Sequence, residues 1–130
     1  MQTLILTGDV NLRNVTDPSV PFALVADALG EADILFGNLE GCLYDATEEV
    51  PYKRGWFHAG AGGAPALQAG GFDAVGCANN VTFGHEAIVA TLARLDEMGI
   101  PHCGAGTSRS DARAPVVLER GGTRYGFLQY

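Results

Sequence analysis

Short apolar runs that lead into Asp or Asn recur along the chain. Residues 4–6, 34–36 and 72–78 consist mainly of Leu, Ile, Val, Phe, Ala and Gly, and each run ends at a small residue followed by a polar one. Runs of this length and composition are typical of buried strands. Residues 101–104 begin a fourth segment of the same kind. The pattern therefore predicts at least four short strands.

Segments with helical spacing separate these strands. Apolar residues recur at helical intervals over 22–29 and most clearly over 84–98, and residues 64–69 form a shorter segment of the same type. Gly30 and Gly99 follow two of these segments, in the position of a helix stop signal. Three helices are therefore expected.

The remaining segments predict a surface loop and a hairpin. Residues 47–63 are rich in Gly and charge, which predicts a loop, while 116–119 and 124–128 form two strand-like runs around Gly121-Gly122. Strands that alternate with helices favour an α/β fold, with a mostly parallel sheet that is flanked by helices and covered on both faces. We expect residues 1–130 to form a single domain, and an incomplete one, because the chain stops inside its last predicted strand.

Composition narrows the classes of partner. The chain has 130 residues, 47% of them apolar, and a net charge of −7. This charge argues against binding to nucleic acid or to an anionic membrane surface, both of which require Lys and Arg. The chain contains no apolar stretch of membrane-spanning length, and its first residues resemble a strand more than a signal peptide. As written, it is expected to be cytoplasmic, and envelope association would require a leader that has been removed.

The three cysteines carry no recognisable motif. Cys42, Cys77 and Cys103 are widely spaced, form no C-x-x-C pair and are odd in number. We expect them to be reduced, mostly buried thiols with no catalytic or metal-binding role.

The candidate chemistry lies at the ends of the first three strands. Asp9, Asn38, Glu40, Asn79 and Asn80 all follow predicted strands. In a parallel sheet the carboxyl ends of successive strands meet at one edge, where ligands bind. Carboxylate and amide oxygens suit Mg²⁺ or Mn²⁺ better than a thiolate-type zinc site. The alternative is structural, since Asp and Asn after a strand also form turns and cap helices.

Seven short motifs follow one another along almost the whole chain: Gly8-Asp9-Val10, Asn38-Leu39-Glu40, Phe57-His58-Ala59, Gly71-Phe72-Asp73-Ala74-Val75, Ala78-Asn79-Asn80, Gly99-Ile100 and Gly104-Ala105-Gly106. In order and spacing, these motifs resemble those of CapA-type poly-γ-glutamate (capsule) biosynthesis proteins, relatives of the calcineurin-like metallophosphoesterases. The resemblance implies a sandwich of two mixed sheets flanked by helices, with metal ions (Mn, Mg, Fe or Zn) held on loops after the strands. It also implies metal-ligand roles for Asp9, Asn38, Glu40 and Asn80.

The chain also departs from the family pattern. Val81 stands where the family usually has His, a candidate proton donor, and Asn11 stands where the superfamily often has another His. His85 is a candidate for the catalytic role, with a solvated position on the first turn of a helix as the alternative. His58 and His102 are expected to be structural.

Two classes of function remain open. The first is a metal-dependent hydrolase or transferase-like protein that acts on a small-molecule or polymer substrate in capsule or cell-envelope metabolism. The second is a catalytically inactive binding or structural module of the same fold, which Val81 favours. A nucleotide-binding domain is disfavoured, since no Gly-x-Gly-x-x-Gly follows the first strand. A homodimer formed through the apolar C-terminal strand is a further expectation.

Overall fold

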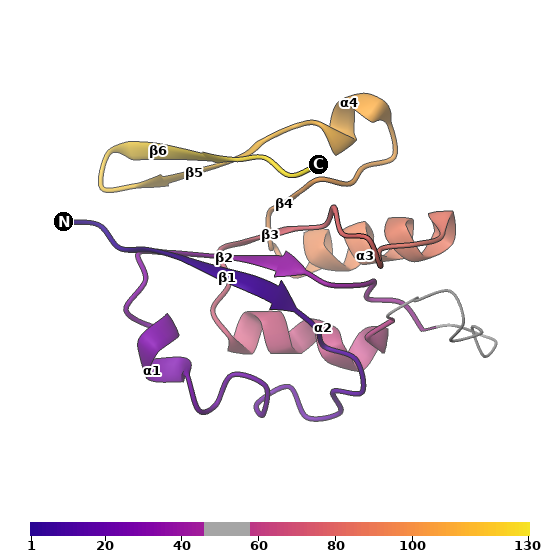
Figure 1. The fold of residues 1–130 in the computed structure, drawn as a ribbon, viewed down its shortest axis with the longest axis horizontal. Coiled ribbons are helices and arrows are strands. Elements are labelled where there is room, and N and C mark those ends of the chain that lie inside the picture. Colours follow the sequence, from indigo (N-terminus) through magenta and orange to yellow (C-terminus); the bar gives the residue numbers. More distant parts are fainter. Residues whose placement is uncertain (46–57) are drawn as a thin grey trace.

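Four parallel strands form the central sheet. The computed structural model describes residues 1–45 and 58–130, and Figure 1 shows their arrangement. The strands follow one another across the sheet in chain order, so the prediction that the first three are neighbours is confirmed. They are β1 (Leu4–Val10), β2 (Ile34–Leu39), β3 (Ala74–Gly76) and β4 (His102–Cys103).

Three of the four helices in the described part of the chain correspond to the predicted helical segments. The longest, α3, begins one residue after Gly84, and Gly99 follows its last turn with a positive φ of 67°. No helix in residues 1–45 or 58–130 combines the length and the apolar character needed to span a membrane. The helices are α1 (Ala26–Leu29), α2 (Gly60–Ala69), α3 (His85–Glu97) and α4 (Arg109–Ala112).

The prediction of a helix over 22–29 is wrong for the first half of this segment. Only the last turn, α1, is helical, and the preceding residues form successive turns with hydrogen bonds between residues three apart. Leu24 is fully exposed, so the apolar residues of this segment do not share one buried face. Phe22 and Leu29 alone pack against the core from this segment.

The predicted loop over 47–63 is corrected at its end. The second helix, α2, already begins at Gly60, and it continues through Pro65 to Ala69. Residues 46–57, which include most of the predicted loop, lie outside the described part of the chain.

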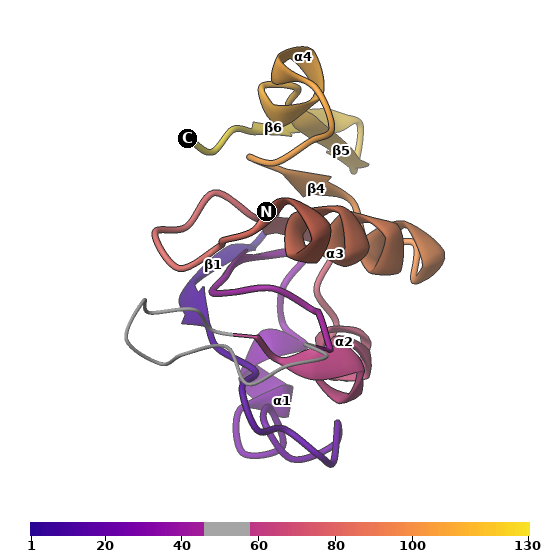
Figure 2. The same cartoon turned by 90° about the vertical axis from the view of Figure 1, so that its right-hand side faces the viewer.

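The two faces of the sheet are covered differently. Side chains of β1, β2 and β3 form the main core with α2 and α3 on one face, as Leu35, Leu67, Val75 and Leu95 illustrate. The predicted hairpin covers the second face, so the expectation of a sheet covered on both faces is confirmed (Figures 1 and 2). A sheet face can be buried by strands as well as by helices, and a hairpin with apolar alternation supplies such a surface.

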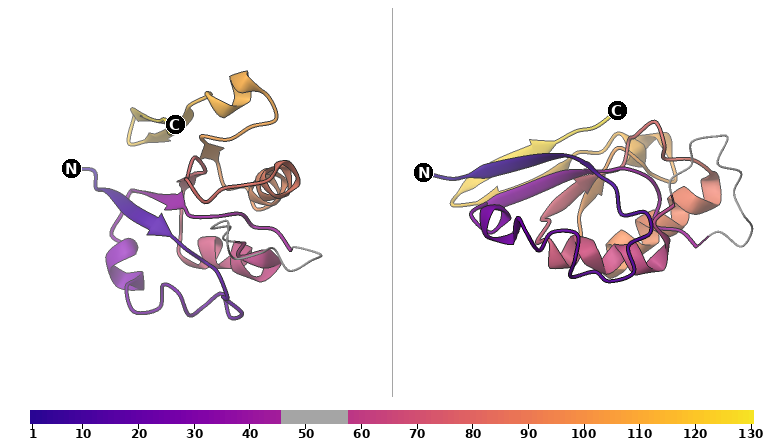
Figure 3. Two further views of the ribbon diagram at one scale, coloured as in Figure 1. Left: turned by 45° about the vertical axis from the view of Figure 1, so that its right-hand side comes forward. Right: turned by 60° about the horizontal axis from the view of Figure 1, so that its bottom comes forward.

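The hairpin consists of β5 (Val116–Arg120) and β6 (Thr123–Phe127), paired in antiparallel fashion around Gly121-Gly122. The ring of Phe127 stacks on Phe36 of β2 with centroids 4.6 Å apart. At the other end of the hairpin, Arg120 forms an ion pair of 2.6 Å with Asp73. As Figure 3 shows, the hairpin runs alongside β1 and β2, and its far end carries the C-terminus back toward the carboxyl edge of the sheet.

Candidate functional site

The carboxyl ends of β1, β2 and β3 bring polar side chains together. Asp9 and Asn38 are paired across the sheet, and Asn38 is in turn paired with Gly76 of β3. The register of β1 and β2 shifts between Leu6 and Asp9, so β1 is locally irregular just before its polar end. We call the resulting cluster the polar edge. It comprises Asp9, Asn11, Asn38, Glu40, Asn79 and Gln129.

Asp9 is the centre of this cluster. Its Oδ1 accepts a hydrogen bond from the Nδ2 of Asn38 and another, of 3.4 Å, from the Nδ2 of Asn79. Residues from three different strand ends therefore meet at one carboxylate, as the sequence predicted for the strand ends.

Glu40 supplies a second carboxylate at the polar edge. Its backbone N–H donates to the carbonyl of Val10 over 3.0 Å, which ties the end of β2 to the end of β1. Its Oε2 accepts a hydrogen bond of 3.0 Å from the Nδ2 of Asn11. Asn11, considered in the sequence only as a replacement for histidine, thus supports the Glu40 carboxylate.

The turn after β3 contributes through Asn79. Asn80, named as a metal ligand from the resemblance, is exposed on this turn, while its neighbour Asn79 makes the contact with Asp9. Val81 is 8% exposed, and its backbone N–H donates to the Oδ1 of Asn79 over 3.0 Å. The valine therefore faces the interior of the protein, and only its backbone takes part in the site.

The three histidines lie on separate segments of the chain. His85 is the first residue of α3 and is exposed. His58 pairs with Cys42 in a short parallel bridge, its ring lies 5.5 Å from that of Tyr44, and burial lowers its pKa. His102 contacts Asp96 at 3.2 Å. Phe57, the first residue of the Phe57-His58-Ala59 motif, lies outside the described residues.

The described residues contain no close group of three or more His, Cys, Asp or Glu side chains of the kind that holds a metal ion. The polar edge instead combines two carboxylates with several amides. Oxygen ligands from carboxylates are hard donors, so the edge remains suited to a hydrated Mg²⁺ or Mn²⁺ ion held by few protein groups.

Gln129 was not identified from the sequence. Its Nε2 donates to the Oδ1 of Asn38 over 2.6 Å, and its Oε1 accepts from the backbone N–H of Ala78 over 2.8 Å. The side chain lies directly over Gly76, where an added Cβ would come within 2.1 Å of the Gln129 Oε1. Gly76 in an otherwise apolar strand was the one sequence signal of this close approach.

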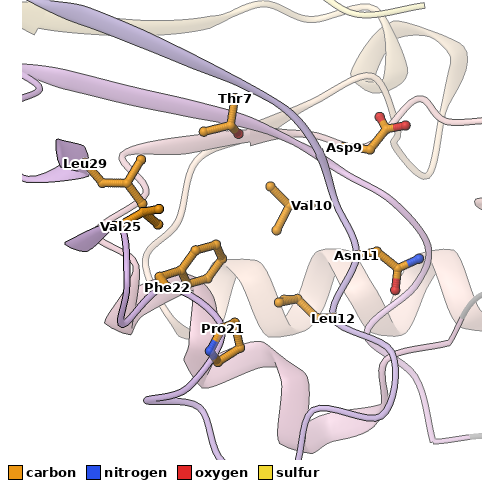
Figure 4. A pocket seen from close by; sticks show the side chains of 9 residues that line it. All are labelled: Thr7, Asp9, Val10, Asn11, Leu12, Pro21, Phe22, Val25 and Leu29. Carbon is orange, nitrogen blue, oxygen red and sulfur yellow. The ribbon is translucent and has the colours of Figure 1, made fainter. Parts of the chain in front are cut away.

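An apolar hollow adjoins the polar edge. It has a volume of about 320 Å³ and lies between β1 and the segment that leads into α1. Figure 4 shows Phe22, Val25 and Leu29 on one side of it, with Asp9 and Asn11 at one end and the Asp9 carboxylate directed away from the apolar group. The Asp9 carboxylate therefore faces away from the hollow, and the hollow is a separate feature beside the polar edge.

The cysteines lie in the interior, as predicted. Cys42, Cys77 and Cys103 are all free and buried. Burial raises the pKa of all three thiols, and that of Cys77 reaches about 12. Thiols with raised pKa are poor nucleophiles and poor metal ligands near neutral pH.

Comparison with known proteins gives a consistent picture over almost the whole chain. The family model described as "Bacterial capsule synthesis protein PGA_cap" matches residues 3–130. Two curated proteins of Sinorhizobium fredii, y4sH and y4uA, are each 34% identical to the chain over 137 residues. These alignments cover 97% of this chain and 29% of each relative, so the chain spans less than a third of the length of the relatives it matches. Both relatives are described as uncharacterized.

Proposed function

Since the chain belongs to the bacterial capsule synthesis protein family, we propose that it acts in the synthesis or processing of poly-γ-glutamate or a related capsule or cell-envelope polymer. We further propose that the polar edge binds this material together with a divalent cation. The observation that carries the proposal is the meeting of Asn38 and Asn79, from two other strand ends, on the carboxylate of Asp9.

The residues of the polar edge fit a hydrated cation. Asp9 and Glu40 would hold it, and the exposed Asn80 lies on the neighbouring turn as a further candidate. Mg²⁺ and similar ions are commonly bound by one or two carboxylates, and they retain several waters that a substrate then replaces. When bound, such an ion would neutralise the negative charge of carboxylate or phosphate groups on the polymer.

The contribution of the chain itself is to bind and orient. The amides of Asn11 and Asn79 hold Glu40 and Asp9 in place. Fixed carboxylates of this kind lose little freedom when a ligand binds, which favours binding.

A catalytically inactive binding module is the second candidate. The observation that favours it is Val81, which is buried and has no group that transfers a proton. Positioned acid–base groups contribute about 10²–10⁴-fold to catalysis. We therefore propose that this chain hydrolyses a generic phosphodiester poorly or not at all. Robust metal-dependent turnover by the wild-type chain would contradict this, and a gain of turnover in Val81→His would support the role assigned to the missing donor.

Cation binding is tested by isothermal titration with Mn²⁺. Asp9→Asn should weaken binding by roughly tenfold or more, since it removes a charged ligand, and Glu40→Gln should weaken it to a smaller degree. Asp27→Asn, which alters an exposed carboxylate on α1, is the matched control and should leave the affinity unchanged. Equal affinities for the wild type and Asp9→Asn would overturn the assignment of Asp9.

A further inference from the structure

The asparagines of the polar edge are oriented by backbone groups. The Oδ1 of Asn79 accepts from the N–H of Val81 over 3.0 Å, and the Oδ1 of Asn11 accepts from the N–H of Arg13 over 3.0 Å. A backbone N–H can only donate, so each amide must present its oxygen to the backbone and its NH₂ group to a carboxylate. Asn79 and Asn11 therefore act as donors to Asp9 and Glu40.

Asn38 is oriented indirectly, because Gln129 lies between it and the backbone N–H group. The N–H of Ala78 donates to the Oε1 of Gln129 over 2.8 Å, which fixes the direction of the glutamine amide. The Nε2 of Gln129 then donates to the Oδ1 of Asn38 over 2.6 Å. Only the Nδ2 of Asn38 is left to face Asp9, and it donates to the Oδ1 of that carboxylate.

We infer that Gln129 is a positioning residue that holds Asn38 as a hydrogen-bond donor to Asp9 and keeps the Asn38 oxygen away from any cation at the polar edge. The inference deepens the proposed function and rests on it only for the use of a cation as a probe. It assigns the cation to the carboxylates of Asp9 and Glu40, and it removes Asn38 from the set of ligands implied by the family resemblance.

The packing around Gln129 supports this role. Gly76 leaves room for the glutamine side chain to lie against β3, where any larger residue would displace it. The hydrogen bonds from Asn38 and Asn79 both go to the Oδ1 of Asp9, so neither amide occupies its Oδ2. That arrangement leaves a second carboxylate oxygen for a ligand while the first is held in place.

The first test releases Asn38 by substitution. In Gln129→Leu the Asn38 amide loses the donor that fixes its oxygen, so it can turn that oxygen toward a cation. Mn²⁺ affinity should rise by about threefold to tenfold, the range that one added polar interaction represents. Gln68→Leu, the same change on the exposed face of α2, is the matched control and should have no effect. If the Asn38 oxygen were already a ligand, Gln129→Leu would leave the affinity unchanged or lower it, and the inference would be wrong.

A second measurement needs neither a cation nor a variant. Nuclear magnetic resonance of the unmodified chain should show through-hydrogen-bond coupling from the Nε2 of Gln129 to the side-chain carbonyl carbon of Asn38, and from the Nδ2 of Asn38 to the carboxylate carbon of Asp9. Coupling in the reverse direction, from the Asn38 amide to Gln129, would overturn the inference. If these couplings appear while Mn²⁺ fails to bind, the orientation by Gln129 stands and the proposed cation site fails.

Discussion

At the scale of single residues, the site depends on close approach as much as on polar chemistry. Asp9 and Glu40 are ordinary carboxylates at strand ends. The amides of Asn79 and Asn11 hold them in place, and the oxygen of each amide accepts a hydrogen bond from a backbone N–H group. Gly76 is the residue that allows Gln129 to reach Asn38, because it has no side chain where the glutamine lies. The arrangement of the polar edge therefore depends on Gly76, a residue that has no side chain.

Gly76→Ala tests this requirement. The new Cβ would lie 2.1 Å from the Gln129 Oε1, so the glutamine must move and give up its bonds to Ala78 and Asn38. We expect the free energy of unfolding to fall by about 1–3 kcal/mol, since the Ala78 N–H loses its partner in a partly buried position. Urea denaturation measures the change. Gly126→Ala, where nothing lies within 4 Å of the added Cβ, should stay within about 0.5 kcal/mol of the wild type.

The buried thiols give a second prediction at this scale. Burial raises the pKa of Cys77 from 9.0 to about 12. The unfolded chain ionises first as the pH rises, so this residue lowers the stability of the fold progressively between about pH 9 and 12 and leaves it unaffected below that range. At pH 8 a thiol reagent should react with Cys77 only after denaturation. Fast stoichiometric reaction of Cys77 in the folded chain would contradict the burial of this residue.

At the scale of elements, α3 positions the loop that follows β2. Thr91 of α3 is 2% exposed, and its Oγ1 donates to the carbonyl of Ala87 over 2.7 Å and accepts from the N–H of Leu43 over 2.9 Å. Arg94, one turn later, donates to the carbonyl of Leu43 over 2.9 Å. The long helix thereby holds the segment that begins just after Glu40.

Thr91→Val tests how much the hydrogen bond between Thr91 and Leu43 contributes to the free energy of unfolding. The substitution keeps the shape of the side chain but leaves the buried N–H of Leu43 without an acceptor, which costs about 1–3 kcal/mol of stability. Thr91→Ser retains the hydroxyl and should lose much less. Thermal and urea unfolding of the two variants check the difference, and equal losses in both would mean that packing of the methyl group matters more than the hydrogen bond.

At the scale of the whole molecule, the hairpin covers the second face of the sheet and brings Gln129 to the ends of β2 and β3. The stacked rings of Phe36 and Phe127 join the hairpin to β2, and the ion pair of Arg120 with Asp73 holds it at the opposite end. The residue that orients Asn38 lies two positions beyond Phe127, so the position of the hairpin and the order of the polar edge are coupled.

A double-mutant cycle measures the aromatic part of this coupling. Phe36→Ala and Phe127→Ala should each destabilise the chain, and the pair should show a coupling energy of about 0.5–1.5 kcal/mol, as expected for stacked rings in contact. Both single variants should also weaken the nuclear magnetic resonance signature of the Gln129–Asn38 bond. Additive effects would show that the rings contribute through burial alone.

Exposed apolar side chains lead to a prediction about association. Leu6, Leu128 and Tyr130 are 62%, 56% and 81% exposed, and they lie on β1 and the end of the hairpin segment. We expect the chain to self-associate through these surfaces, as apolar groups beside strand edges favour pairing. Sedimentation velocity over a range of concentrations tests this expectation. A cooperative monomer at high concentration would contradict it, and Leu128→Lys should reduce any association that is observed.

The sequence by itself determined the strands, the longest helix, the hairpin and the edge at which the polar residues gather. Local patterns suffice for these features, because apolar runs, glycine stops and the parallel βα arrangement act over short stretches of chain. The family was also evident from the ordered motifs, since their spacing extends over nearly the whole chain.

Only the tertiary structure decided which face the hairpin covers, that Asn79 rather than Asn80 contacts Asp9, and which way the amide of Asn38 points. Gln129 and Asn38 are 91 positions apart, and the direction of their hydrogen bond depends on the backbone N–H of Ala78, in a third segment. No local periodicity encodes such a bond, because its donor and acceptor roles are assigned only when distant strand ends are brought into register.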